Sequence, residues 1–144
     1  MWLYIVGLLV FVLDQLSKLL VPRILSSQAS LPVIPKIFHI TLVRNTGIAF
    51  GLFKGNSPWL FLIIALSVAF LLILSFRLRL SSRLTQVAYG MVLGGALSNF
   101  FDRALRGGII DYLDFRVWPV FNIADFSISV GVGLFFIAIW FRRF

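Results

Sequence analysis

The chain contains no cysteine, no glutamate and a single histidine, His39, in 144 residues. Without cysteine it can form neither a disulfide framework nor a thiolate nucleophile. One histidine without glutamate argues against a zinc or di-iron site, because such sites take several His, Cys or Glu ligands. The HExxH motif of the site-2 metalloproteases is also absent. We therefore predict an activity that needs neither a metal nor a cofactor.

Acidic residues are scarce as well. All five are aspartates, and four of them, Asp102, Asp111, Asp114 and Asp125, lie in the single stretch 94–125. Apolar runs long enough to cross a bilayer flank this stretch or form part of it. Carboxylates at membrane depth are costly and are usually kept for function. The clustering favours an aspartyl hydrolase that works in the membrane or at its surface.

The composition indicates an integral membrane protein. Hydrophobic residues make up 60% of the chain and the mean hydropathy is +1.03, with the apolar residues gathered in blocks. The net charge is +8, but the basic residues flank apolar runs, so we predict contact with anionic lipids and not with nucleic acid. The N-terminal apolar run has no basic region before it and no small-residue cleavage site after it. This favours a retained first span over a removed signal peptide.

We predict one domain, 1–144, of the membrane α-helical class, with four transmembrane helices and a small extracytoplasmic β-sheet cradle. Pro22 is expected to end the first span, and the second has no charge over about 19 residues, long enough for the hydrocarbon core. In the third, Gly90 and Gly94 favour close helix packing. The spans are expected at 2–21, 58–76, 84–103 and 122–141.

The segment 22–57 is predicted to form the cradle. A β-branched run with loose alternation surrounds His39, and glycines follow it, which favours a small sheet lying on the membrane over a helix. His39 is interpreted as a strand residue at the interface and not as a catalytic one. Asn45 is expected either to stabilise a turn or to form a hydrogen bond to a ligand.

The arginines predict the orientation. The side with both termini carries dense positive charge next to the span ends, which favours the cytoplasm. Asp111 and Asp125 then lie together on the opposite side, near the outer ends of the third and fourth spans. The arginines concerned are Arg77, Arg79, Arg83, Arg142 and Arg143.

Several polar residues have a structural interpretation beside a functional one. Asp14 and Lys18 have the i,i+4 order of a helix ion pair, which either lets the helix end emerge into water or supports a site. Asp102 beside Arg103 is interpreted as a supporting ion pair. Asn122 is a good N-cap for the fourth span and could serve in that role alone.

The pair Asp111 and Asp125 suits peptide hydrolysis without metal, serine or cysteine. Two carboxylates that approach closely share one proton, so that one acts as base toward water and the other as acid toward the carbonyl or leaving amine. We expect Asp125 to be the more readily ionised, because a helix N-terminus favours negative charge. By spacing alone, Asp114 could take the place of Asp111.

Other classes fit the sequence less well. A small transporter or channel should carry charges deeper in its spans, and a non-catalytic scaffold would use Asn122 and Asp125 only as a cap. A rhomboid-like protease needs His39 beside a membrane serine. A Ser/Lys peptidase needs Ser17 and Lys18 together, but adjacent residues on a helix face apart.

Five sequence blocks occur in order along almost the whole chain: LDQLSK at 13–18, RNTGIAFG at 44–51, GGALSNFFDR at 94–103, GGIIDYLDF at 107–115 and FNIADFSISVG at 121–131. Each block is modest evidence, but the ordered set is specific. On these blocks the chain resembles the lipoprotein signal peptidases (signal peptidase II), bacterial aspartyl endopeptidases of the inner membrane.

The resemblance implies that Asp111 and Asp125, and not Asp114, are the catalytic pair. It implies four transmembrane helices with a periplasmic cradle, a multi-pass location in the inner membrane, and an active site near the extracytoplasmic face. The implied substrate is a diacylglyceryl-modified prolipoprotein, cut just before the lipidated cysteine, and the implied inhibitor is globomycin. We further expect a monomer in contact with membrane lipids. The supporting positions that it implies are Asp14, Lys18, Asn45, Gly95, Asn99, Asp102, Arg103, Asn122 and Ala124.

Three residues depart from the pattern of the family. Ser98 stands where glycine is usual, Ile48 where alanine is usual, and Phe126 where serine is usual. None of the departures removes a carboxylate. Ser98 bears on packing, and Phe126 removes a hydroxyl beside Asp125, so an effect on fine tuning and substrate preference is expected.

Overall fold

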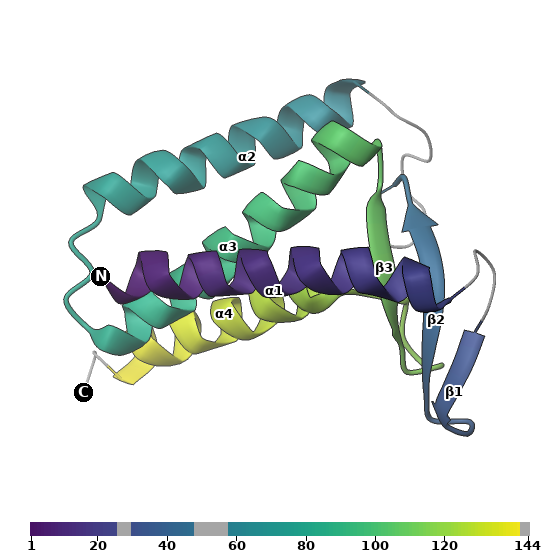
Figure 1. The fold of residues 1–144 in the computed structure, drawn as a ribbon. Helices are drawn as coiled ribbons and strands as arrows, with labels where there is room; N and C mark the ends of the chain where they lie inside the picture. Colours follow the sequence, from purple (N-terminus) through teal and green to yellow (C-terminus); the bar gives the residue numbers. More distant parts are fainter. Residues whose placement is uncertain (26–29, 48–57, 142–144) are drawn as a thin grey trace.

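The computed structural model describes residues 1–25, 30–47 and 58–141. The helices run lengthwise beside one another, and a small sheet stands across one end of them (Figure 1). The N-terminus and the end of the last described helix lie away from the sheet. The elements are α1 (Trp2–Ile24), β1 (Ser30–Ile34), β2 (Phe38–Asn45), α2 (Pro58–Arg77), α3 (Arg83–Arg106), β3 (Ile109–Asp114) and α4 (Ile123–Trp140).

Helix α3 is the central helix, and it packs against both α1 and α4. Glycines allow the close approach. A Cβ on Gly94 would lie 2.3 Å from the Gly7 carbonyl oxygen, and one on Gly95 would lie 2.6 Å from the Ala124 carbonyl oxygen. Main chains in such contact leave no room for a side chain. The prediction that small residues of this helix serve close packing is confirmed.

Gly94→Ala is expected to lower the free energy of unfolding by about 1–3 kcal/mol, because the added methyl overlaps the main chain of α1 and the two helices must separate. Thermal unfolding in detergent measures the change. Gly133→Ala is the matched control, since a Cβ there meets nothing within 4 Å. Its melting temperature should equal or slightly exceed that of the wild type, because alanine favours a helix over glycine. Equal losses in the two variants would contradict the packing argument.

Helix α2 is held to α3 at two levels. Near its first turn, the rings of Phe61 and Phe100 stack with centroids 5.5 Å apart. Farther along, the Tyr89 hydroxyl donates to the Leu71 carbonyl oxygen at 2.7 Å, and leucines of α2 pack against the buried apolar cluster around Tyr89. These contacts fix α2 beside α3 along one wall of the cavity described below.

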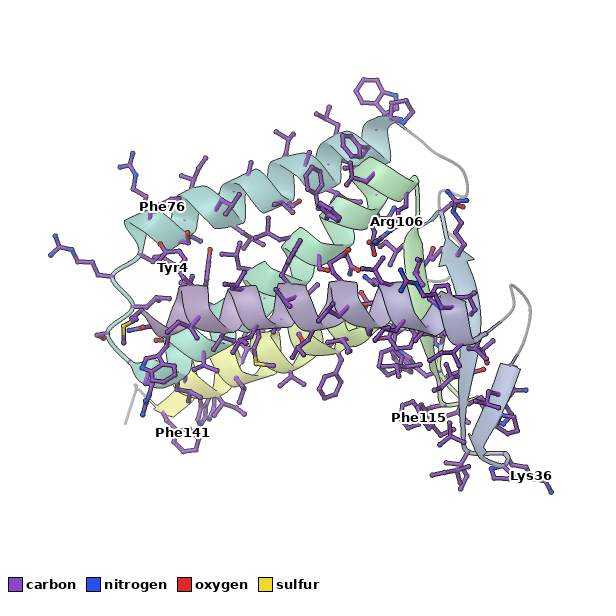
Figure 2. The ribbon with its side chains drawn as sticks, viewed as in Figure 1. Tyr4, Lys36, Phe76, Arg106, Phe115 and Phe141 are labelled. Atoms are coloured by element: carbon purple, nitrogen blue, oxygen red, sulfur yellow. The ribbon has the colours of Figure 1, made fainter. Side chains whose placement is uncertain are left out.

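Large apolar side chains project outward along the helices (Figure 2). Within the described ranges, α1 and α4 are long and apolar enough to cross a membrane, and Phe61–Arg77 of α2 is a shorter apolar helix. Helix α3 is less apolar over its length, because it carries polar residues such as Asn99 and Asp102. These residues are buried against the neighbouring helices. The arrangement with four spans stays a prediction.

The sheet has the order β1–β2–β3, and both strand pairs are antiparallel. Asp111 of β3 lies opposite Val43 of β2, and Asn45 lies opposite Ile109. Side chains two residues apart on a strand share a face. Asp111 and Asn45 therefore point to the same side of the sheet.

Two expectations from the sequence are wrong. Residues 109–114 lie outside the segment 22–57 that was predicted to form the whole cradle, but they form β3; two of the six are aspartates, and the strand that they pair with is distant in sequence. Pro22 does not end α1, which runs to Ile24, so the first residues assigned to the cradle belong to the helix. Leu25 N–H donates to the Val21 carbonyl oxygen at 2.9 Å, so helical bonding resumes past the missing proline N–H. The β-branched run around His39 forms β2, as predicted.

Candidate functional site

A cavity of about 850 Å³ lies where β2 and β3 meet α2, α3 and α4. Its walls are polar next to the sheet and mostly apolar farther along the helices. The ionisable and amide residues that line it are Arg44, Asn45, Asn99, Arg103, Asp111 and Asp125. The apolar lining includes Ile64, Val68, Leu71, Ala96 and Ile128.

Asp111 enters the cavity from the sheet and is 2% exposed. One oxygen, Oδ2, accepts a hydrogen bond from Asn45 Nδ2 at 3.0 Å. The other, Oδ1, accepts from Asn122 Nδ2 at 2.6 Å. The first bond follows from the strand register, which places Asn45 and Asp111 on one face of neighbouring strands.

Asp125 enters the cavity from the first turn of α4. Its Oδ1 accepts a hydrogen bond from Asn99 Nδ2 at 2.7 Å. Its own N–H donates to Asn122 Oδ1 at 2.9 Å, which is the N-cap bond predicted from the sequence. Asn122 is therefore more than a cap, because the same side chain touches both Asp111 and the start of α4.

The three asparagines are held so that their NH₂ groups face the two carboxylates. An asparagine side chain has one acceptor oxygen, so a donor bound there fixes which way the amide points. Asn45 Oδ1 accepts from Gly47 N–H at 3.0 Å, Asn122 Oδ1 accepts from Asp125 N–H, and Asn99 Oδ1 accepts from Lys18 Nζ at 3.0 Å. Of the two alternatives left open for Asn45, the turn is present, and the amide also contacts Asp111.

Burial, and to a smaller extent the nearby charge of Asp125, raise the pKa of Asp111 from 3.8 to about 6. The hydrogen bonds from Asn45 and Asn122 and the charge of Lys18 act in the opposite direction. Asp111 lies in β3, outside the helices. Its raised pKa means that this carboxyl group retains a proton into the mildly acidic range. This is the behaviour expected where two carboxylates lie close to each other.

The raised pKa predicts that Asp111 makes the protein less stable at neutral than at acidic pH. The ordinary pKa is 3.8 and the folded-state pKa is about 6, so the stabilising contribution is complete below about pH 3.8 and is lost as the pH rises through about 6. Between pH 5 and pH 7.5 we expect a loss of about 1.4 kcal/mol. Thermal unfolding at the two pH values measures it.

Asp111→Asn is the control for that measurement, because it removes the titration of this carboxyl group. We compare the free energy of unfolding of the wild type with that of Asp111→Asn. The wild-type value minus the variant value should fall by about 1.4 kcal/mol between pH 5 and pH 7.5. A difference that does not change with pH would contradict the raised pKa.

A buried charge cluster lies behind the asparagines. Lys18 Nζ is 2.6 Å from Asp14 Oδ2 and 2.7 Å from Asp102 Oδ2, and all three side chains are fully buried. Asp102 also pairs with Arg106, one helical turn farther on. The cluster holds two carboxylates and two cations, so its formal charge is balanced. The predicted pair of Asp14 and Lys18 is confirmed.

The expected ion pair between Asp102 and Arg103 is wrong. The structure pairs Asp102 with Lys18 and Arg106 instead, because i,i+4 neighbours share a helix face and adjacent residues do not. Arg103 lies on the cavity and donates through NH2 to the Gly47 carbonyl oxygen at 2.6 Å. Its guanidinium therefore holds Gly47 at the cavity beside the carboxylates.

Sequence reasoning did not single out two members of this region. Gln15 donates from Nε2 to Asp102 Oδ1 at 3.0 Å and to Ser98 Oγ at 2.8 Å, and Arg106 donates to Gln15 Oε1 at 3.0 Å. The i,i+4 spacing of Asp102 and Arg106 was the available signal for Arg106. For Gln15 the signal was its place beside Asp14 in a predicted span.

Ser98, the departure from the family pattern in α3, is fully buried. Its hydroxyl donates to Asp14 Oδ2 at 2.7 Å. Asp14 Oδ1 in turn accepts from Ala124 N–H, beside Asp125, at 2.8 Å. Ser98 is thus part of the polar cluster as well as of the packing. Phe126 is exposed on α4, and Ile48 lies outside the described residues.

Asp114 and His39 do not line the cavity. Asp114 accepts from Thr41 Oγ1 at 2.8 Å and pairs with Arg116 at 3.1 Å. His39 Nδ1 lies 3.1 Å from Ser30 Oγ, within the sheet. In the described part of the chain, no cluster of three or more His, Cys, Asp or Glu residues could hold a metal ion.

Comparison with known proteins identifies the family. The family model for Signal peptidase (SPase) II matches residues 6–141. The chain belongs to the signal peptidase II family. This is an aspartic peptidase family, so the predicted class of enzyme is confirmed.

The relatives in this family match over nearly their whole length. The lipoprotein signal peptidase of Halothermothrix orenii is 43% identical over 137 residues, which cover 95% of this chain and 94% of that protein. The lipoprotein signal peptidase of Brevibacillus brevis is 39% identical over 137 residues, which cover 93% and 91% of the two chains.

Two solved structures of bacterial membrane enzymes, both obtained by the in meso method, share the fold. The first has a TM-score of 0.84 at 32% identity and covers 96% of this chain and 87% of that one. The second has a TM-score of 0.79 at 33% identity and covers 94% and 90%. The arrangement of four helices and a small antiparallel sheet is therefore shared with membrane enzymes.

Proposed function

We propose that this chain is an aspartyl endopeptidase that removes the signal peptide from diacylglyceryl-modified prolipoproteins, cutting just before the lipidated cysteine. One observation carries the proposal. Asp111 and Asp125 line a single cavity, and each carboxylate accepts a hydrogen bond from an amide whose orientation a second donor fixes. Membership of the signal peptidase II family agrees with it.

In the proposed reaction Asp125 is the base and Asp111 the acid. Asp125 takes a proton from a water molecule while the water oxygen attacks the scissile carbonyl carbon, and Asp111 gives its proton to the carbonyl oxygen. The tetrahedral diol then collapses with cleavage of the C–N bond. The leaving nitrogen takes the proton from Asp125, and a diol hydroxyl returns a proton to Asp111, so the pair regains its starting state.

The remaining residues of the cavity support this assignment. Asn45, Asn99 and Asn122 hold the carboxylates through N–H donors, which stabilises the ionised forms at a site that burial makes unfavourable for charge. Arg103 holds Gly47 and adds positive charge next to the pair. Asp14, Lys18 and Asp102 fix Asn99 from behind, and Gly95 and Ala124 bring α3 and α4 into contact.

The apolar part of the cavity and the apolar surfaces of the helices support the proposed substrate and location. A diacylated cysteine stays in the bilayer, so the scissile bond must be cut near the interface. Four spans with cytoplasmic termini would place Asp111 and Asp125 near the extracytoplasmic face of the bacterial inner membrane. We propose that the chain works there as a single-domain monomer among lipids, and that globomycin-type peptides compete for the same cavity.

The test is cleavage of a prolipoprotein by the purified protein, with diacylglyceryl-modified and unmodified forms of one substrate side by side. We expect the modified form alone to be cut, at the bond before the lipidated cysteine by mass of the products, and globomycin to stop the reaction. Equal cleavage of both forms would show that the enzyme does not require the diacylglyceryl group. If neither form is cut, the proposal fails and a transporter that uses the same aspartates becomes the better hypothesis.

A further inference from the structure

The two residues that flank the candidate pair are tied to one turn of α1. Tyr112 directly follows Asp111, and its hydroxyl donates to Ser17 Oγ at 2.5 Å. Ala124 directly precedes Asp125, and its N–H donates to Asp14 Oδ1 at 2.8 Å. The Ser17 hydroxyl donates to the Asp14 carbonyl oxygen at 2.6 Å. A continuous path of hydrogen bonds therefore joins β3 to the start of α4 through α1.

Tyr112 acts on Asp111 only through the backbone of β3. Successive side chains of a strand point to opposite faces, so Tyr112 faces α1 when Asp111 faces the cavity. Tyr112 is 4% exposed and does not line the cavity. A change at its hydroxyl can therefore reach the carboxylate only by letting the strand shift.

The α1 end of the path is rigid. Asp14 is fully buried, and its Oδ2 is held by Lys18 Nζ at 2.6 Å and by the Ser98 hydroxyl at 2.7 Å. Its other oxygen, Oδ1, accepts the hydrogen bond from Ala124 N–H. The turn of α1 that accepts the hydrogen bonds from Tyr112 and Ala124 is thus held against α3. It can therefore determine the positions of β3 and α4 relative to each other.

We propose that the Asp14–Ser17 turn of α1 sets the separation between Asp111 and Asp125, with Ser17 and Tyr112 as positioning residues. The inference rests on the proposed function. Sharing one proton requires the two carboxylates to be close, and the coupling between them weakens as they move apart. The Tyr112–Ser17 bond is one of the links that hold Asp111 at its distance, and the Tyr112 hydroxyl also contacts the main chain of Ile123 at the start of α4.

The charged groups around Asp111 come from three helices: Asp125 of α4, Lys18 of α1 and Arg103 of α3. The neutral donors Asn45 and Asn122 complete its surroundings. Removing the Tyr112 hydroxyl takes away none of these groups. A change in the pH dependence of cleavage therefore reports a change in their distances to Asp111.

The test is Tyr112→Phe in the full-length protein, with kcat, KM and the pH profile measured on the diacylglyceryl-modified prolipoprotein. We expect kcat to fall about tenfold and KM to stay within about twofold, because misplaced reacting groups slow the chemical step. We expect the upper limb of the profile to move about 0.5 pH unit toward acid, since a more distant Asp125 charge raises the pKa of Asp111 less. Ser17→Ala should behave alike, and Ser17→Thr, which keeps the hydroxyl, should restore both values.

Tyr4→Phe is the matched control. It removes the same atom from a half-exposed tyrosine of α1 that does not line the cavity. Its kcat and pH profile should equal those of the wild type. If Tyr112→Phe keeps the wild-type profile, or if both tyrosine variants lose activity alike, the inference is overturned while the proposed function stands. A wild type that does not cleave the substrate overturns both.

Discussion

Asp111→Asn and Asp125→Asn are each expected to lower the kcat of prolipoprotein cleavage by at least about a thousandfold. An amide neither takes a proton from water nor gives one to a carbonyl oxygen, so each substitution removes one half of the proposed acid–base pair. The measurement is cleavage of the diacylglyceryl-modified substrate by purified variants, with thermal unfolding to show that each one is folded.

Asp125→Asn is the cleaner of the two variants. Its amide oxygen can still accept the hydrogen bond from Asn99, whereas both oxygens of Asp111 accept from amides, so an asparagine at 111 must turn its NH₂ toward another donor. Asp114→Asn is the control, because this carboxylate lies in the same strand but bonds Thr41 and Arg116 away from the cavity. It should keep the wild-type kcat. Substantial cleavage by Asp125→Asn would refute the two-aspartate mechanism.

Lys18→Met is expected to lower the free energy of unfolding by about 3–5 kcal/mol, the usual cost of removing one partner from a buried ion pair. Lys18 lies between Asp14 and Asp102, and the three side chains are fully buried. Methionine fills a similar volume, so the loss of stability is due to the removal of the positive charge. Arg106 still compensates Asp102, and Asp14 is left without a cation. Thermal unfolding in detergent measures the effect.

Lys36→Met is the control for this prediction, because Lys36 is exposed at the end of the sheet (Figure 2) and the same substitution there should leave the melting temperature nearly unchanged. Lys18→Met also removes the shorter of the two hydrogen bonds to Asn99 Oδ1 and leaves the one from Asn122 Nδ2 at 3.3 Å, so the Asn99 amide is held less firmly toward Asp125. Equal melting temperatures for Lys18→Met and the wild type would show that the cluster does not stabilise the fold.

Much of the fold could be predicted from local patterns. The four helices coincide with the expected apolar runs to within three residues at each end, because length and composition define such helices without reference to the rest of the chain. The strand around His39 was likewise visible in its β-branched residues. Strand β3 was not, because a strand with two aspartates among its six residues is recognised only from its pairing with β2.

Part of the candidate site could likewise be predicted from the sequence, and part could not. The residue types and their order in the five blocks were sufficient to suggest the family and the candidate pair, and the N-cap role of Asn122 followed from its place before an apolar run. The orientation of the asparagine amides was not predictable, because each is fixed by a donor from elsewhere in the fold or from a turn. Lys18, which fixes Asn99, is 81 residues away from it in sequence.

By itself, the sequence determined an apolar chain with few carboxylates and the chemistry that two of them could perform. Only the tertiary structure separated Asp111 from Asp114 physically: three residues apart on a strand, they point to opposite faces, one into the cavity and the other away from it. It also paired Asp102 with Lys18 and Arg106 instead of Arg103. The reason in both cases is that direction and distance between side chains depend on elements that meet only when the chain is folded.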